Sequence, residues 1–158
     1  MAALAGAVAA EGQPDAGLAG LDKSLGATVG HKLFTVLVLN WDKGEFRRFY
    51  SSQPKAYPVG NSRPIPSGGW YIEDVVRGGR PRISRDWDAV KADFADHDLI
   101  RSLGCESCVN VPVRWKGTTL GTLNLLHEAN WYTDADLPVL TAFAAMSVPV
   151  LLEIVRRW

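Results

Sequence analysis

The sequence has little of several residue types that would narrow its function. Its 158 residues include only two cysteines and three histidines, too few for a disulfide-stapled secreted domain, and the histidines are too scattered for a four-ligand zinc site. Basic and acidic residues balance at 17 each, giving a formal net charge of zero. The chain therefore lacks the positive surface that binding to phosphate backbones requires, and we expect no nucleic-acid partner.

Long apolar segments are also lacking. The runs "LFTVLVL" and "FAAMSVPVLLEIV" are too short or too interrupted to span a bilayer. The N-terminus "MAALAGAVAAEGQPD" lacks the basic region that begins a signal peptide. We therefore expect a cytoplasmic protein without a membrane partner, and in a reducing compartment we expect no structural disulfide.

The length and composition that are present are typical of one globular domain. Apolar residues make up 47% of the chain and charged residues 22%. Residues 1–28 read as helix interrupted at "GQPD", so we predict a helical extension over residues 1–14 and a single domain over residues 15–158. Residues 31–41 and 45–52 read as two strands joined by a turn at "DKGE".

The rest of the chain begins with a long connection. Residues 53–69 contain four prolines and three glycines, so we predict no regular structure there, and so long a connection is usually functional. We then predict a short helix over 70–79, a brief strand over 80–84, two helical pieces over 85–104 and a hairpin over 108–128 with Gly117 at its tip. A closing helix over 132–158 has a capping box at Thr133 and Asp136 and a kink at Pro149. This order predicts an α+β fold around an antiparallel sheet.

Several segments together resemble the GAF domain. They are an "IP-x-G" turn before a short helix, "SLGCESCVNVPV", "KGTTLGTLNL" and the helix start "YTDADLPVLTAFA". The resemblance covers roughly residues 15–155. It implies a GAF/PAS-like sheet of about six antiparallel strands, with N- and C-terminal helices on one face and a loop- and helix-roofed pocket on the other. It also implies a small-molecule sensor module, although a fold does not choose the ligand.

The two cysteines form a Cys-x-x-Cys spacing at Cys105 and Cys108. Such a spacing can serve a metal site, a dithiol redox centre or ordinary packing. A redox thiolate is favoured at a helix N-terminus, whereas these cysteines follow a helix end and enter a strand, so we interpret them as small buried side chains. The free methionine-R-sulfoxide reductases are GAF proteins with catalytic cysteines, but the segment "IPSGGWYIEDVV" has no cysteine near the turn where their resolving pair lies. A thiol-based enzyme related to them remains the alternative function.

The hairpin predicts the pocket floor. If Trp115, Lys116 and Gly117 form a three-residue turn, Arg114 pairs with Thr118. One face then carries Val109, Val111, Leu123 and Leu125 together with Gly121 and His127, and its apolar side chains suit packing against helices. The other face carries Cys108, Asn110, Thr122 and Asn124. Either these polar groups contact a ligand, or the two asparagines bond each other or buried water.

Aromatic residues in or beside the long connection predict the pocket walls, because small-ligand sites combine apolar walls with a few polar groups. Ordinary packing under a long loop is the alternative for each of them, and Tyr50 belongs to the same group. His97 lies near the expected mouth, and Arg82 is a candidate contact for an anion. We predict no catalytic residue and no metal ligand, and the cofactor is unknown. The predicted ligand-binding residues are Asn110, Asn124, Thr122, Cys108, Tyr57, Trp70, Trp87, Phe94 and His97.

The functional hypothesis is a noncatalytic small-molecule sensor that signals through its helices. The closing helix carries more apolar residues than one face can bury on a sheet, which predicts a homodimer through the terminal helices. A pure dimerisation module with a vestigial pocket is a further alternative.

Overall fold

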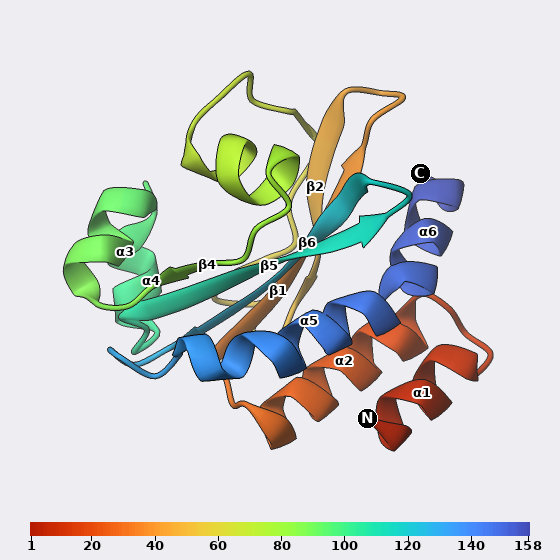
Figure 1. Ribbon diagram of the computed structural model, residues 1–158, viewed down its shortest axis with the longest axis horizontal. Coiled ribbons are helices and arrows are strands. Elements are labelled where there is room, and N and C mark those ends of the chain that lie inside the picture. The colour runs from red at the N-terminus through yellow and green to blue at the C-terminus, as the bar shows by residue number, and fades with distance from the viewer.

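The computed structural model describes residues 1–158 as one α+β unit (Figure 1). In chain order its elements are α1 (Ala2–Ala9), α2 (Asp15–Thr28), β1 (Leu33–Asn40), β2 (Glu45–Ser51), β3 (Arg63–Pro64), η1 (Tyr71–Arg77), β4 (Arg82–Ser84), α3 (Trp87–Asp93), α4 (His97–Ser102), β5 (Ser107–Trp115), β6 (Thr118–His127), η2 (Asp134–Asp136), α5 (Leu137–Met146) and α6 (Val148–Arg157).

The strands form one six-stranded antiparallel sheet in the order β3-β2-β1-β6-β5-β4, which confirms the predicted fold class. Strand β3 corrects one expectation, because it falls inside the proline-rich connection where we predicted no regular structure. Its Pro64 pairs with Glu45 of β2 at the outer edge of the sheet. An edge strand tolerates proline because no further strand needs the missing N–H.

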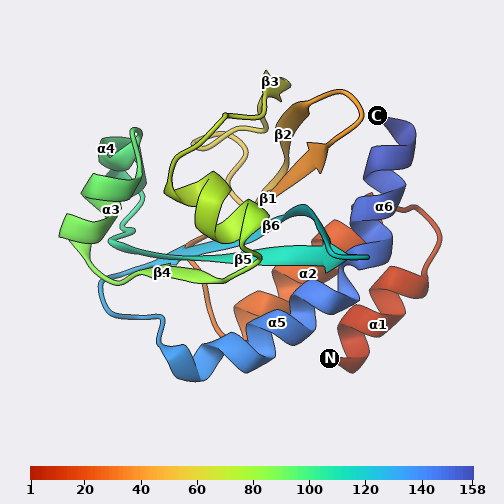
Figure 2. The ribbon, with the colours of Figure 1, turned by 45° about the horizontal axis from the view of Figure 1, so that its top comes forward.

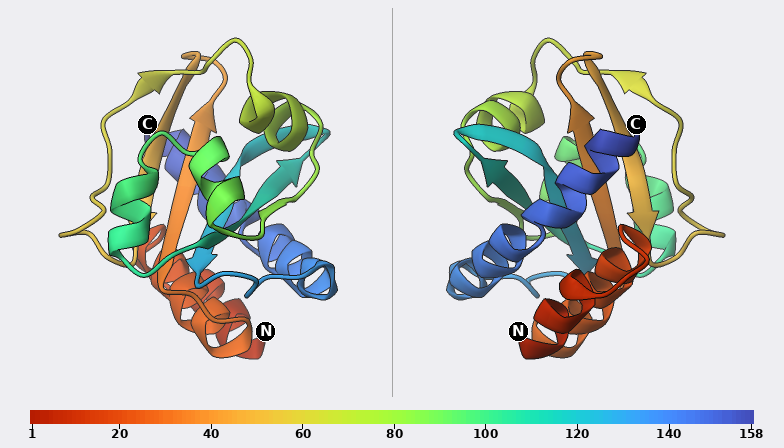
Figure 3. Two further views of the ribbon diagram at one scale, coloured as in Figure 1. Left: turned by 90° about the vertical axis from the view of Figure 1, so that its left-hand side faces the viewer. Right: turned by 90° about the vertical axis from the view of Figure 1, so that its right-hand side faces the viewer.

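The two faces of the sheet are covered differently (Figures 2 and 3). Helices α1, α2, α5 and α6 pack on one face, and η1, α3 and α4 lie over the other. The main core lies between the sheet and the terminal helices, where Phe34, Leu123 and Phe143 are among the fully buried side chains. The second face is therefore free to hold a cavity under the smaller helical segments.

Helix α1 packs onto α2 and shares the main core. Its Leu4 is fully buried in that core. The side-chain amide of Gln13 donates to the backbone oxygens of Ala7 and Val8, which fixes the chain between the two helices. A Cβ on Gly20 would come 2.3 Å from the Cβ of Ala7, so the close approach of α1 to α2 depends on this glycine.

The closing helical segment starts and bends as the sequence indicates. The backbone N–H of Thr133 donates to the Asp136 carboxylate at 2.8 Å, within the predicted capping box. Helices α5 and α6 meet at Ser147 with a bend of 43°, and Pro149 lies in the first turn of α6. No single helix is long and apolar enough to cross a membrane, although η2–α5 and α6 together reach that length and composition.

The β5–β6 turn differs from the prediction. It has two residues, Lys116 and Gly117, both with positive φ, as type I′ hairpin turns require. The predicted three-residue turn is therefore wrong, and Asn110 pairs with Asn124 instead of Thr122. An extra residue, Leu120, bulges out of β6 between the pairs Val113–Gly121 and Arg114–Thr119. Relative to the predicted pairing, the shorter turn shifts the register by one residue and the bulge shifts it by one more. Because the total shift is two residues, the side chains beyond the bulge keep the face that the sequence predicts.

Candidate functional site

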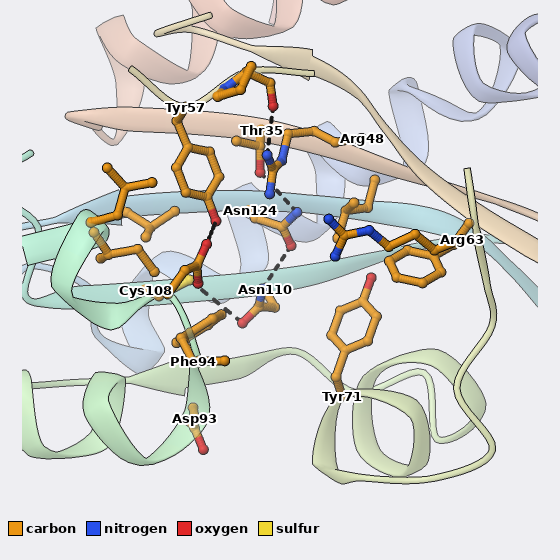
Figure 4. A pocket seen from close by; sticks show the side chains of 18 of the residues that line it. Thr35, Arg48, Tyr57, Arg63, Tyr71, Asp93, Phe94, Cys108, Asn110 and Asn124 are labelled. Atoms are coloured by element: carbon orange, nitrogen blue, oxygen red, sulfur yellow. Dashed lines mark hydrogen bonds between the residues drawn. The ribbon is translucent and has the colours of Figure 1, made fainter. Parts of the chain in front are cut away.

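A cavity of about 510 Å³ lies on the face of the sheet opposite the terminal helices (Figure 4). Strands β1, β2, β5 and β6 form its floor, and the long connection, η1 and the α3–α4 segment surround it. This volume falls within the range of small-molecule sites. It is lined by Thr35, Leu37, Phe46, Arg48, Tyr57, Pro58, Arg63, Trp70, Tyr71, Asp93, Phe94, Ala95, Asp96, Leu99, Ile100, Cys108, Asn110, Asn124 and Leu126.

The floor is built on a hydrogen-bonded row of polar side chains. Asn110 pairs with Asn124 across β5 and β6, and Asn124 pairs with Thr35 across β6 and β1. The Asn110 amide nitrogen donates to the Asn124 oxygen at 2.8 Å, and the Asn124 nitrogen donates to the Thr35 hydroxyl at 3.2 Å. The Cys108 thiol lies 3.6 Å from the Asn110 oxygen. The two asparagines thus bond each other, and these bonds fix the orientation of both amides at the cavity floor without deciding whether a ligand also contacts them.

Aromatic side chains form the walls. Tyr57 is buried, and its hydroxyl donates to the Asp96 carboxylate at 2.6 Å. The Trp70 indole N–H donates to the Asp93 backbone oxygen at 3.1 Å, and its ring meets Phe94 edge-on. These bonds hold both rings in place without a ligand.

Tyr71 adds a wall residue from η1. Its hydroxyl lies 2.9 Å from the Thr122 hydroxyl. Burial raises the pKa of Tyr71 to about 12, and the bond to Thr122 opposes that shift. The phenol therefore stays protonated at neutral pH and presents a neutral hydroxyl group to the cavity.

The charged groups around the cavity are unequally paired. Arg82 binds the Asp93 carboxylate through two nitrogens, at 2.8 and 3.1 Å, and Ser84 donates to the same carboxylate at 2.7 Å. Arg82, the candidate contact for an anion, is therefore already bound to a protein carboxylate. Arg48 instead lies 4.0 Å above the Tyr57 ring and donates to the Pro58 backbone oxygen at 2.7 Å. No carboxylate lies within ion-pair distance of Arg48.

Six of the nine predicted ligand-binding residues line the cavity, and three do not. The six are Asn110, Asn124, Cys108, Tyr57, Trp70 and Phe94. Thr122 is on the predicted face but is fully buried against the Tyr71 hydroxyl. Trp87 and His97 lie outside the cavity, edge to face with each other, where the His97 Nδ1 is 2.8 Å from the Phe94 backbone oxygen.

The prediction missed Thr35, Arg48, Arg63 and Tyr71. Thr35 is the one polar residue inside "LFTVLVL", and that interruption was an available signal. The register between β1 and β2 is irregular, because Val36 pairs with Tyr50 but Leu37 pairs with Arg48. Phe49 is the extra residue, so both Phe49 and Tyr50 pack on the helix side. Strict alternation would instead place Tyr50 and Arg48 on the same face.

Both cysteines are buried, in agreement with the interpretation from sequence. Burial raises the pKa of Cys105 to about 11, even though the nearby charge of Lys32 lowers it. Burial also raises the pKa of Cys108, and the charges of Cys105 and Asp93 add to the effect. Both groups are therefore thiols at neutral pH, whereas a thiol nucleophile has to be ionised to react.

Solved structures share this fold at low sequence identity. The GAF domain of an Acinetobacter phosphoenolpyruvate-protein phosphotransferase aligns with a TM-score of 0.73 at 11% identity, covering 95% of this chain and 89% of that one. The GAF domain of a two-component sensor histidine kinase from Bacillus halodurans aligns at 0.66 and 15%, covering 88% and 92%. The free methionine-R-sulfoxide reductase of Neisseria meningitidis, solved with its substrate, aligns at 0.71 and 19%, covering 98% and 86%.

Sequence comparison gives a more specific result than these structural similarities. No curated protein matches the chain. The family model of the GAF domain matches residues 24–147, from within α2 to the end of α5, and so includes every strand of the sheet and every residue that lines the cavity. This chain belongs to the GAF domain family.

Proposed function

We propose that this protein is a noncatalytic sensor domain that binds a small molecule in the cavity above Asn110 and Asn124. The observation that carries the proposal is the combination of a fixed polar floor with aromatic walls around about 510 Å³. Small-ligand sites have this composition, in which the polar groups orient the ligand and the apolar walls supply burial energy. We include a cytoplasmic location in the proposal, because both cysteines are free, as expected in a reducing compartment.

A signal would leave the cavity through the sheet to the terminal helices. Asn124 and Thr35 face the cavity, while their neighbours Leu123 and Phe34 face the helices and belong to the main core. A ligand that shifts the floor therefore acts on strands whose other face carries α2, α5 and α6. We include a homodimer through these helices in the proposal, as the route by which such a shift reaches a partner.

A thiol-based reductase is less well supported than a sensor. The fold of the Neisseria enzyme is similar, but likeness at 19% identity concerns the fold alone. Both cysteines here are buried, with raised pKa values, so neither is ionised at neutral pH as a thiol nucleophile has to be.

A thermal-shift screen against small metabolites tests the proposal. A compound present at about one hundred times its Kd stabilises the folded state by about 2.7 kcal/mol. Ala95 is exposed at the cavity, whereas Ala92 is exposed on α3 outside it. Ala95→Trp should therefore abolish the stabilisation, and the matched Ala92→Trp should retain it. Equal stabilisation of both variants by every active compound, or no active compound, would contradict the proposal.

A further inference from the structure

We propose that the ligand of this cavity is a small organic anion, a carboxylate with an apolar body, held by Arg48 and Arg63. This inference rests on the proposed function, because it names the ligand class for the same cavity. The protein leaves the positive charges of both arginines without a carboxylate partner. A guanidinium group stays charged at every physiological pH, so it needs a counter-charge or water wherever it is placed.

Arg48 has unused hydrogen-bonding capacity at the cavity. One of its terminal nitrogens donates to the Pro58 oxygen, but its Nε is buried and has no hydrogen-bond partner. The Tyr57 ring below the guanidinium supplies a cation–π contact without neutralising the charge. Leaving a buried donor unbonded is costly, and a bound acceptor removes that cost.

Arg63 brings a second positive charge to the same face of the sheet. It pairs with Phe46 across β2 and β3, and Phe46 and Arg48 are two residues apart on β2. Residues opposite each other, and residues two apart, share a face. Arg63 is therefore a diagonal neighbour of Arg48, and Figure 4 shows both guanidinium groups on the cavity side. Arg63 also has no carboxylate within ion-pair distance, whereas Arg77, Arg80 and Arg82 each have one.

The acidic residues at the cavity do not offset these two charges. Asp93 is neutralised by Arg82 and also accepts from Ser84. Asp96 is exposed to solvent and accepts a hydrogen bond from the Tyr57 hydroxyl. Arg48 makes its cation–π contact with the ring of the same tyrosine. Asp96 is thus one unpaired negative charge against two arginines, so the net unpaired charge of the lining is positive, and both arginines are on the side formed by β2 and β3.

The apolar lining of the cavity favours a ligand whose carboxylate is attached to an apolar body. The cavity is also lined by Leu37, Phe46, Phe94 and Leu126, and no lysine lines it. A guanidinium fork matches a planar carboxylate with two parallel hydrogen bonds. A carboxylate attached to an aryl or alkyl group uses both the arginines and the apolar walls, whereas inorganic phosphate uses only the arginines.

Calorimetric titration of the full chain with three probes tests this inference. The probes are 3-phenylpropionate, its uncharged analogue 3-phenylpropionamide and inorganic phosphate, all at one fixed ionic strength. The carboxylate should bind about tenfold or more tightly than the amide, as expected for hydrogen bonds to a charged group. The preference should disappear in Arg48→Gln and weaken in Arg63→Gln, a change at an exposed edge residue that leaves the core untouched.

Arg47→Gln is the matched control. Arg47 precedes Arg48 on β2 but lies over the Phe49 ring and donates to the Gly60 oxygen, away from the cavity. This variant loses the same formal charge and should keep the preference for the carboxylate. An amide that binds as well as the acid, a preference unchanged in Arg48→Gln, binding of phosphate alone, or no binding of the acid would each overturn the inference. A neutral compound that binds in the metabolite screen would overturn only the ligand class and leave the proposed function standing.

Discussion

Asn110 and Asn124 face each other across the β5–β6 pair, with the amide nitrogen of one 2.8 Å from the amide oxygen of the other. Both side chains are almost fully buried, and both border the cavity. The pair is therefore a structural element and a candidate ligand contact at once. Its two roles can be separated by substitution.

Replacing both asparagines should cost less stability than the sum of the two single replacements. Asn124→Leu leaves the Asn110 donor and the Thr35 hydroxyl without their partner, so we expect a loss of about 1–3 kcal/mol in the free energy of unfolding. In Asn110→Leu/Asn124→Leu the pair disappears together, and the loss should be smaller than the sum of the single losses by at least about 0.5 kcal/mol. Urea denaturation of the four proteins measures this cycle, and strictly additive losses would argue against a coupled pair.

The cysteines should be slow to react in the folded protein. Both are buried, and the pKa of Cys105 is raised to about 11, so little thiolate exists at pH 8. Iodoacetamide should modify neither residue in native protein and both in urea, as followed by mass spectrometry of the intact chain. Fast labelling of Cys105 or Cys108 under native conditions would revive the thiol-enzyme alternative.

A histidine–aspartate contact should make stability depend on pH. His31 Nε2 lies 3.0 Å from the Asp22 carboxylate of α2, which also accepts from Tyr50 on β2. Burial alone would lower the pKa of His31, but the hydrogen bonds and charge of Asp22 raise it above its ordinary 6.5. Burial alone would raise the pKa of Asp22, but hydrogen bonds from His31 and Tyr50 lower it below 3.8.

Both pKa shifts stabilise the folded protein, but over different pH ranges. The raised His31 pKa contributes stability that is fully present below pH 6.5 and is lost as pH rises through the folded-state pKa of His31. The lowered Asp22 pKa contributes stability that is present above pH 3.8 and is lost as pH falls through the folded-state pKa of Asp22. The difference in unfolding free energy between wild type and His31→Gln should therefore be larger at pH 6 than at pH 9. Burial lowers the pKa of His127, and the charge of His31 adds to that shift. The part due to burial is common to both proteins and cancels, whereas the part due to His31 only reduces the expected difference. A difference independent of pH would contradict the contact.

The homodimer prediction now depends on a smaller surface than the sequence indicated. Most apolar residues of the closing helix, including Phe143 and Leu151, are buried within the chain. Leu152 and Trp115 remain exposed beside one apolar hollow. We expect a dimer by sedimentation at micromolar concentration, and Leu152→Glu should dissociate it, since a charge in an apolar interface is costly. Val59→Glu, at an exposed apolar residue of the long connection, should stay dimeric, and a monomeric wild type would contradict the prediction.

The sequence predicted the fold better than the site, for identifiable physical reasons. Alternation along β5 and β6 correctly assigned Cys108, Asn110 and Asn124 to one face, because parity survives a shift of two residues. The turn itself was predicted wrongly, since the compensating bulge at Leu120 has no local signature. The irregular register beside Val36 has a similar effect on β2, where it turns Tyr50, grouped with the wall aromatics, to the helix side and leaves Arg48 on the cavity side. His97 and Trp87 show the remaining difficulty, because the orientation of a short helix within a long connection depends on tertiary packing.

Side-chain NMR of asparagine tests the central claim most directly. In protein labelled with ¹⁵N-asparagine, each side-chain NH₂ gives its own signals, and Asn110 and Asn124 are identified through their leucine variants. Titration with a compound that stabilises the wild type should shift the signals of Asn110 and Asn124, while those of Asn130, beyond the end of β6 and outside the cavity, should stay unchanged. A stabilising compound that leaves the Asn110 and Asn124 signals in place would contradict a ligand site above this pair.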